Sequence, residues 1–262
     1  MRFAAGVDAY DRSVGRYSQQ VAPRFAAFAG VDALARGRVL DVGCGPGALA
    51  AWLAERRGGA ALSAVDPTEH FVEACRERIP GADVRLAPAE ALPFPDATFE
   101  AALAQLVFSF VADGPRAAAE MARVVRPGGV VATCNFEAES FGPARAFWAA
   151  ARRFDPAAPD DVHLPYRREP ELLGLLQGAG LREVRAGSFD IEVDYDRFDE
   201  LWEMFAGGVG PTGGYLLAQP PERREALRQA LHESLGRPRA GFALTARVIA
   251  VAGRRPEAQG SA

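Results

Sequence analysis

The sequence of 262 residues contains no lysine, and it has only three cysteines and three histidines. Cys44, Cys75 and Cys134 are far apart and show no C-x-x-C spacing, which argues against a zinc or dithiol motif. We expect buried free thiols and, from their odd number and the lack of a signal peptide, a cytoplasmic location. The longest apolar stretch, 101–112, contains two polar residues and is too short for a membrane span.

The chain also has no excess of positive charge, because its net charge is −4 and its pI is near 5.6. The arginines are scattered and form no basic stripe, so we expect no nucleic-acid partner. His163, beside Asp160 and Asp161, could be a base or a metal ligand, but we expect an ordinary loop histidine and assign no metal site. Hydrophobic residues make up 49% of the chain and charged residues 24%, which indicates a globular protein with a sizeable core.

The most informative stretch is residues 39–49, V-L-D-V-G-C-G-P-G-A-L. It predicts a short strand, a tight turn on three glycines, and a helix. Gly43, Gly45 and Gly47 let backbone N–H groups approach a ligand without an intervening Cβ. The helix that follows presents free N–H groups and the positive end of its dipole. We therefore predict a nucleotide-type site at the carboxyl end of this strand.

The nature of the nucleotide depends on the acid before the turn. Gly43, Gly45 and Ala48 also satisfy the loose dinucleotide pattern G-x-G-x-x-G/A. Asp41, however, would repel a pyrophosphate and suits a ligand with an ammonium and a sulfonium. With Cys44 in the turn, the stretch resembles motif I of class I S-adenosylmethionine-dependent methyltransferases. The resemblance implies that Asp41, Gly43, Cys44 and Gly45 bind S-adenosyl-L-methionine.

A second acid, Asp66, ends the next predicted strand, 21 positions after Gly45. That distance is the length of one helix and one strand, and an acid there accepts hydrogen bonds from both hydroxyls of a ribose. The ribose of NAD would be bound in the same way, so Asp66 does not distinguish the two cofactors. In the methyltransferases the residue after this acid touches adenine, which implies that role for Pro67.

Residues 87–99, A-P-A-E-A-L-P-F-P-D-A-T-F, resemble a second segment of these methyltransferases, G-D-A-E-x-L-P-F-x-D-x-x-F-D. Pro88 replaces the family's Asp, which accepts a bond from the adenine amino group. Adenine recognition is then expected to rely on the backbone near Ala89, on apolar packing or on water. Gln105 lies late in the next predicted strand, 99–108, and is expected to orient the amino acid part of the donor or the acceptor.

The N-terminal region resembles the cap of small-molecule methyltransferases, through Y-D-R-S-V-G-R-Y-S at residues 10–18. In that cap, aromatic side chains lie over the methyl donor, so Tyr17 and Tyr10 are expected to shield the sulfonium by cation–π contact. Apolar residues three and four apart predict an amphipathic helix over 21–34.

Strands and helices alternate through residue 136, which predicts a Rossmann-like, doubly wound α/β fold. We expect strands at 38–42, 62–65, 83–86, 99–108, 130–136, 181–193 and 242–251. The family resemblance implies a seven-stranded, mostly parallel sheet whose last strand runs antiparallel at the sheet edge, next to the fifth, and a helical cap. The expected divisions are an N-terminal cap helix region (1–36), an S-adenosylmethionine-binding core (37–136), the remainder of the fold with acceptor-binding cap insertions (137–252) and a disordered tail (253–262).

The second half of the chain is rich in aromatic residues, which suits a planar or apolar acceptor. We expect the acceptor pocket in residues 137–180 and 194–240, which carry Phe141, Phe147, Trp148, Phe154, Tyr166, Tyr195, Phe198, Trp202, Phe205 and Tyr215. The glycine-rich stretch 207–214 is expected to form a mobile loop that lets the cap open and close.

The sequence thus predicts a methyltransferase that acts on a small molecule, and it resembles the ubiquinone and menaquinone biosynthesis group. Because the sulfonium is already activated, alignment of the acceptor and exclusion of water suffice, and we assign no catalytic residue. An NAD(P)-dependent oxidoreductase is an alternative, although the chain lacks a Tyr-x-x-x-Lys pair. A non-catalytic S-adenosylmethionine-binding protein is another. The methylated atom, whether O, N or C, and the oligomeric state remain open.

Overall fold

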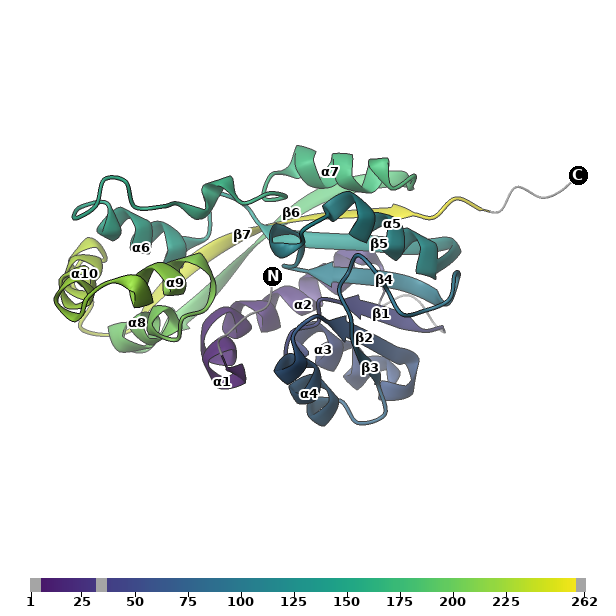
Figure 1. The fold of residues 1–262 in the computed structure, drawn as a ribbon, viewed down its shortest axis with the longest axis horizontal. Coiled ribbons are helices and arrows are strands. Elements are labelled where there is room, and N and C mark those ends of the chain that lie inside the picture. Colours follow the sequence, from purple (N-terminus) through teal and green to yellow (C-terminus); the bar gives the residue numbers. More distant parts are fainter. Residues whose placement is uncertain (1–5, 32–36, 258–262) are drawn as a thin grey trace, which may run out of the picture.

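A computed structural model describes residues 6–31 and 37–257 and contains a seven-stranded sheet with helices on both faces (Figure 1). The strands are β1 (Val39–Val42), β2 (Leu62–Asp66), β3 (Asp83–Leu86), β4 (Phe99–Gln105), β5 (Val125–Phe136), β6 (Arg182–Tyr195) and β7 (Phe242–Arg254). Their spatial order is β3-β2-β1-β4-β5-β7-β6. β1 to β5 pair in parallel, whereas β7 pairs antiparallel with β5 and β6.

This arrangement confirms the predicted doubly wound, mostly parallel sheet with an antiparallel last strand beside the fifth. The position of that strand at the sheet edge was wrong, because β7 lies between β5 and β6 and β6 forms the edge. The strand order reverses between β1 and β4, which lie side by side although β2 and β3 intervene in sequence. Open α/β sheets bind ligands at the carboxyl ends of the strands at such a switch point.

The helices cover the sheet in two layers. They are α1 (Val7–Tyr10), α2 (Arg16–Ala29), α3 (Ala48–Arg57), α4 (Glu69–Arg78), α5 (Gly114–Val124), α6 (Gly142–Ala151), α7 (Glu169–Gly178), α8 (Phe198–Ala206), α9 (Gly210–Ala218) and α10 (Pro221–Ser234). Alternate strand residues enter different cores, because successive side chains of a strand point to opposite faces. In β4, Leu103 packs in the core under α2, α3 and α4, and Ala104 packs in the core under α5 and α7.

The remaining helices, α6, α8, α9 and α10, gather at one end of the molecule, over the ends of β6 and β7 that extend past the other strands (Figure 1). Their buried side chains continue the core that lies under α2. Val248 and Ala250 of β7 belong to the same core. The helical cap that the sequence predicts is therefore packed on the sheet as part of one hydrophobic interior.

The structure differs from the prediction in one helix and in one expected loop. α2 spans residues 16–29 rather than 21–34, because Gly30 adopts φ +73 and ends the helix, and residues 32–34 lie outside those described. The expected glycine loop 207–214 was also wrong, because α9 begins at Gly210. Pro211 favours this start, since proline at the first turn has its φ already set for the helix.

Two strands also have different bounds. β4 ends at Gln105 instead of residue 108, because Leu106 has φ +61 and residues 108–110 form a 3₁₀ turn. β5 begins at Val125 rather than 130, and residues 126–129 form a bulge where the pairing with β4 shifts register.

The C-terminal end of β7 passes the expected boundary at residue 252. The strand continues to Arg254, and the Arg255 N–H donates to the Gly129 carbonyl at 2.9 Å. Residues 258–262 of the expected tail lie outside those described. Across 6–31 and 37–257, no helix has the length and apolarity that crossing a membrane requires.

Candidate functional site

The glycine turn after β1 is fixed by hydrogen bonds to β2. The N–H groups of Gly43 and Cys44 both donate to the Val65 carbonyl, at 2.8 and 2.9 Å. Gly43 has φ +72, and a Cβ there would lie 2.6 Å from the Val107 Cγ2. Glycine is therefore required at position 43 both by the backbone conformation and by the close approach of Val107.

Asp66 ends β2 beside this turn. Its Oδ2 accepts from the Gly45 N–H at 2.9 Å, and its Oδ1 accepts from the Thr68 N–H at 2.8 Å. The carboxylate is thus held in one orientation, and the side chain is buried. Burial raises the pKa of Asp66, while the bonds from Gly45 and Thr68 oppose that rise.

Asp41, on β1, is a second buried acid in this region. Burial, followed by the charge of Asp66, raises the pKa of Asp41 to about 7, and a bond from the Ala50 backbone opposes the rise. No residue of the described chain bonds to Asp41 Oδ2 or to Gln105 Oε1, although both atoms are buried. Both residues line a small recess with Cys44 beside the glycine turn. Two buried acceptors without a donor fit an ammonium group, as the expected methyl donor carries.

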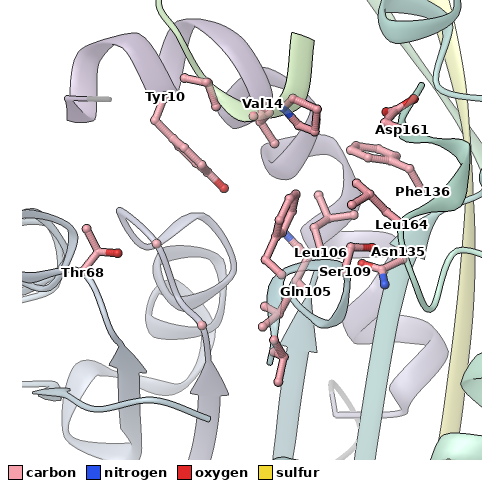
Figure 2. Close-up of a pocket in the computed structure, with 18 of the residues that line it drawn as sticks. Tyr10, Val14, Thr68, Gln105, Leu106, Ser109, Asn135, Phe136, Asp161 and Leu164 are labelled. Carbon is pink, nitrogen blue, oxygen red and sulfur yellow. The ribbon is translucent and has the colours of Figure 1, made fainter. Parts of the chain in front are cut away.

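A larger cavity of about 250 Å³ opens between the carboxyl ends of the strands and the cap (Figure 2). One side is formed by the glycine turn and the residues after β2 and β3, and the other by residues after β4 and β5, with parts of the cap. The lining includes Tyr10, Val14, Gly43, Gly45, Asp66, Pro67, Thr68, Pro88, Ala89, Glu90, Gln105, Leu106, Val107, Ser109, Asn135, Phe136, Phe141, Asp161, Leu164, Arg167, Met204 and Val209. The cavity therefore joins the candidate donor residues to the second half of the chain.

Most of the residues predicted from the sequence lie around these two cavities. They are Asp41, Gly43, Cys44, Gly45, Asp66, Pro67, Ala89 and Gln105. Gln105 lines both cavities, and its amide nitrogen donates to the Ser18 carbonyl at 3.0 Å. Sequence reasoning missed Thr68 and Asn135. Asn135 had a signal, because it is a polar residue near the end of an otherwise apolar strand.

Tyr17 requires a correction. It is completely buried away from both cavities, and its hydroxyl lies 3.0 Å from the Tyr195 hydroxyl. Its ring packs edge-on against Phe136 and Phe141. Helix α2 directs Tyr17 toward the core. Tyr10, the last residue of α1, lines both cavities instead.

The aromatic residues of the cap also differ from the prediction. Of the ten expected to form the acceptor pocket, Phe141 alone is among the described residues that line the large cavity. Trp148 is fully buried, with its ring centroid 5.2 Å from that of Phe147 and 5.3 Å from that of Tyr215. These rings therefore build the interior of the cap. Met204 and Val209 contribute its surface toward the cavity.

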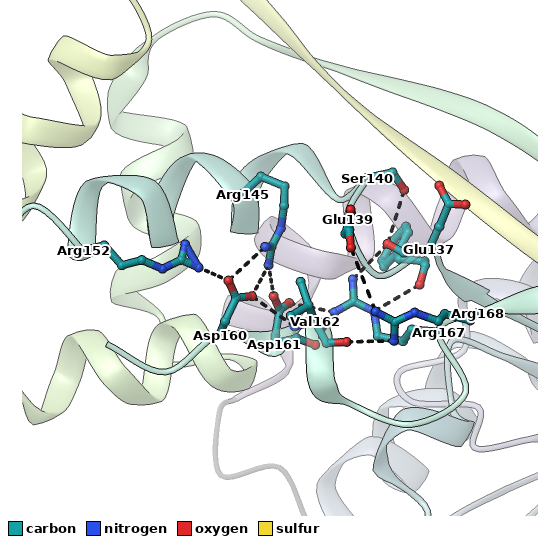
Figure 3. A network of polar contacts seen from close by, with 11 residues as sticks. Glu137, Glu139, Ser140, Arg145, Arg152, Asp160, Asp161, Val162, Arg167 and Arg168 are labelled. Atoms are coloured by element: carbon teal, nitrogen blue, oxygen red, sulfur yellow. Dashed lines mark hydrogen bonds and ion pairs between the residues drawn. The ribbon is translucent and has the colours of Figure 1, made fainter. Parts of the chain in front are cut away.

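A network of ion pairs holds the wall of the cavity that residues 152–168 form (Figure 3). Asp161 accepts from Arg145 of α6 and from Arg167, whose Nη1 lies 2.9 Å from Asp161 Oδ2. Arg167 also donates to the carbonyls of Phe136, at 3.1 Å, and Glu137, at 3.2 Å. The network thus ties the end of β5 to this segment and to α6.

Few titratable groups in the cavity are free for proton transfer. None of the three histidines, all in the described ranges, lines it. His70 packs on Phe71, and His163 is exposed in the 152–168 segment. Within 6–31 and 37–257, no group of three or more His, Cys, Asp or Glu side chains is arranged to hold a metal ion. The geometry supports binding and alignment more than acid–base chemistry.

Comparison with known proteins gives the family. A methyltransferase domain family matches residues 40–133. Malonyl-[acyl-carrier protein] O-methyltransferase of Geobacter sulfurreducens is 32% identical over 222 residues, which is 81% of each chain. Phosphatidylethanolamine N-methyltransferase of Cereibacter sphaeroides is 35% identical over 152 residues, 56% of this chain and 72% of that one.

Solved structures share the fold. The YcgJ protein of Bacillus subtilis covers 92% of this chain and 99% of its own, with a TM-score of 0.56 at 18% identity. A phosphoethanolamine N-methyltransferase of Haemonchus contortus, in complex with S-adenosylhomocysteine, covers 95% of this chain and 60% of its own, with a TM-score of 0.55 at 12% identity. The match to the methyltransferase domain family and to the curated O-methyltransferase sets aside the oxidoreductase and non-catalytic alternatives. The chain belongs to the class I methyltransferases, enzymes that use S-adenosyl-L-methionine.

Proposed function

We propose that this enzyme transfers the methyl group of S-adenosylmethionine to a small molecule bound in the half of the cavity that faces the cap. The observation that carries the proposal is the continuity of the cavity. Asp66 and the glycine turn line one side of it, and Phe136, Phe141 and Met204 line the other. A donor and an acceptor bound in one such space meet without crossing solvent.

The donor half has a group for each part of S-adenosylmethionine. Asp66 accepts from the ribose hydroxyls, since its fixed carboxylate retains lone pairs beyond the two bonds it makes. Asp41 and Gln105 accept from the ammonium through their unpaired buried oxygens. Pro67 and Ala89 pack against adenine without a side-chain hydrogen bond. The turn from Gly43 through Cys44 to Gly45 lets the amino acid part approach the backbone.

The acceptor half is mainly apolar, and its walls come from the residues after β4 and β5 and from the cap. In this proposal residues 37–136 hold the donor and supply part of the acceptor half, and the segments after them complete it and exclude water. S-adenosylmethionine supplies an activated methyl group, so the chain has only to align the acceptor with it. The apolar side chains Phe136, Phe141 and Leu164 suit an acceptor with an aromatic or aliphatic part.

The named relatives leave the methylated atom open. One acts on malonyl-[acyl-carrier protein] as an O-methyltransferase and the other on phosphatidylethanolamine as an N-methyltransferase. Each name describes a small reactive group attached to a larger carrier. The mainly apolar walls of the cavity beyond the donor residues suit such a group and the start of its chain.

The proposal is tested by binding and then by transfer. Calorimetric titration of the purified protein with S-adenosylhomocysteine and with NADH should give binding of the first and not of the second. Asp66→Asn should weaken that binding, whereas Asp83→Asn, at a partly exposed acid paired with Arg38 and Arg85, should not. Incubation of cell extract with isotopically labelled S-adenosylmethionine and the enzyme should then give a labelled small molecule. Label found only in nucleic acid, or only on amino-acid side chains and not on a small group carried by a larger molecule, would contradict the proposal.

A further inference from the structure

Helix α9 begins in the wall that the cap gives to the acceptor half of the cavity. Four consecutive residues at the start of this nine-residue helix line the cavity, and they are Val209, Gly210, Pro211 and Thr212. The glycine-rich stretch that was expected to form a mobile loop therefore has a defined place beside the acceptor half.

The first turn of α9 carries backbone donors that the protein does not use. The N–H groups of Gly210 and Thr212 donate to no acceptor among the residues that the structure describes, and Pro211 between them has no N–H. A side-chain oxygen of the N-cap residue usually accepts such a bond, but the N-cap of α9 is Val209. Two N–H groups are thus left at the positive end of the helix dipole.

A third donor, the Thr212 hydroxyl, lies at the same helix end. Thr212 is 7% exposed, and its hydroxyl forms no hydrogen bond within the described part of the chain. A buried polar group without a partner is rare, because its removal from water costs free energy. The first turn is closed toward the preceding chain, since a Cβ on Gly213 would lie 2.5 Å from the Gly208 carbonyl carbon. The cavity is therefore where a partner for the hydroxyl can bind.

The three donors fit an oxyanion, such as a carboxylate or a phosphate, better than a cation or a neutral group. Each N–H or O–H supplies one hydrogen bond, and the helix dipole favours negative charge at this end. Asp161, the acid that the second half of the chain contributes to the cavity, is paired with both Arg145 and Arg167. Its charge is therefore balanced within the wall, and it leaves room for an anion at α9.

We propose, on the basis of the proposed function, that the acceptor carries an oxyanion that binds Gly210 and Thr212 at the start of α9, while another group of the acceptor receives the methyl. An oxyanion held by three donors is a weaker nucleophile, because its lone pairs are engaged and its charge is stabilised. The oxyanion therefore fixes the acceptor in the cavity, and a different atom of the same molecule reacts.

The first test measures the binding of simple anions. Protein labelled with a nitrogen isotope and saturated with S-adenosylhomocysteine is titrated, at constant ionic strength, with acetate, with inorganic phosphate and with acetamide as the neutral probe. We expect an anion to shift the amide resonances of Gly210 and Thr212, and acetamide to leave them in place. A response to acetate alone identifies a carboxylate, and a response to phosphate alone identifies a phosphate. No response to either anion would overturn the inference, whereas failure to bind S-adenosylhomocysteine would contradict the proposed function instead.

The second test uses variants of the same residue. Thr212→Val should weaken anion binding by about tenfold, the effect of one lost hydrogen bond to a charged group, and Thr212→Ser should retain it. Because the hydroxyl has no partner in the described chain, the melting temperature of ligand-free Thr212→Val should not fall. Thr245→Val is the matched control, since Thr245 is an exposed residue of β7 and does not line the cavity.

Methyl transfer gives an independent measurement. With cell extract and isotopically labelled S-adenosylmethionine, Thr212→Val should lower the rate of label incorporation at limiting extract by a similar factor, and its affinity for S-adenosylhomocysteine should not change. The anion that binds should inhibit the unaltered enzyme at the same ionic strength. Equal rates of transfer by Thr212→Val and the unaltered enzyme would overturn the inference and leave the methyltransferase assignment intact.

Discussion

Asp41→Asn gives the sharpest test of the donor site, because the two side chains have the same shape and differ in charge. Asp41 is buried beside Asp66, and its Oδ2 has no bonding partner among residues 6–31 and 37–257. Burial and the charge of Asp66 raise its pKa to about 7. The free protein is therefore expected to hold a proton at Asp41 at mildly acidic pH, and a bound ammonium is expected to displace it.

The sign of the effect on stability follows from the raised pKa. Between the ordinary value of 3.8 and about 7, the folded chain keeps a proton that the unfolded chain has lost. The free energy of unfolding therefore falls as pH rises through this range and levels off above it. The pKa difference corresponds to about 4 kcal/mol. Asp41→Asn should remove most of this fall, and the part due to Asp66, whose pKa is also raised, should remain.

Binding of S-adenosylhomocysteine should show the opposite trend. Its ammonium favours ionised Asp41, so the affinity should rise by about 50-fold from about pH 5 to about pH 7 and by only about twofold more above that. Calorimetry in two buffers of different ionisation enthalpy should detect proton release on binding near pH 6, about one pH unit below that pKa. Asp41→Asn should weaken binding at neutral pH and reduce the release. An affinity that is flat over this range in the unaltered protein, or equal proton release in the variant, would refute the reasoning.

Three further substitutions test the same structure. Asp66→Asn should weaken binding of S-adenosylhomocysteine by about 2 kcal/mol, measured by calorimetry, because it replaces charge-assisted hydrogen bonds to the ribose with neutral ones. Gly43→Ala should lower the melting temperature and donor affinity together, since its Cβ would approach Val107 to 2.6 Å at a positive φ; unchanged values would mean that the turn relaxes freely. Trp148→Ala should cost about 3–5 kcal/mol in denaturant unfolding, because the ring is fully buried in the cap, and a folded variant should still bind the donor.

The fold could be predicted where the local sequence decides it. The glycine turn at 43–47 requires positive φ at three positions, and the glycines at those positions indicate it in the sequence. The place of Asp66 at the end of the second strand could be predicted because one helix and one strand separate it from the glycine turn. The alternation of strands and helices predicts the parallel sheet, because each crossover needs a helix.

The rest depends on packing that no local pattern specifies. Tyr10 and Tyr17 look equivalent in sequence, yet the course of the chain from α1 into α2 points one toward the cavity and buries the other against Tyr195. Trp148 was expected at the acceptor because it is aromatic, but its neighbours in the cap bury it completely. The Asn135 amide nitrogen donates to the carbonyl of Tyr166, 31 residues further along the chain, and no local pattern indicates that contact.

The register of β6 and β7 has a consequence for engineering this enzyme. Tyr195 and Phe242 are the last paired residues of the two strands, and their rings stack with centroids 5.3 Å apart. The segment between them, 196–241, carries α8, α9 and α10 and so leaves and re-enters the sheet at adjacent points. A replacement segment of another length would meet the same two anchors, and closing a longer loop between them adds little entropic cost. Because 196–241 also packs against α6, through Phe205 on Phe147 and Tyr215 on Trp148, a replacement segment would have to keep those contacts as well as the two anchors.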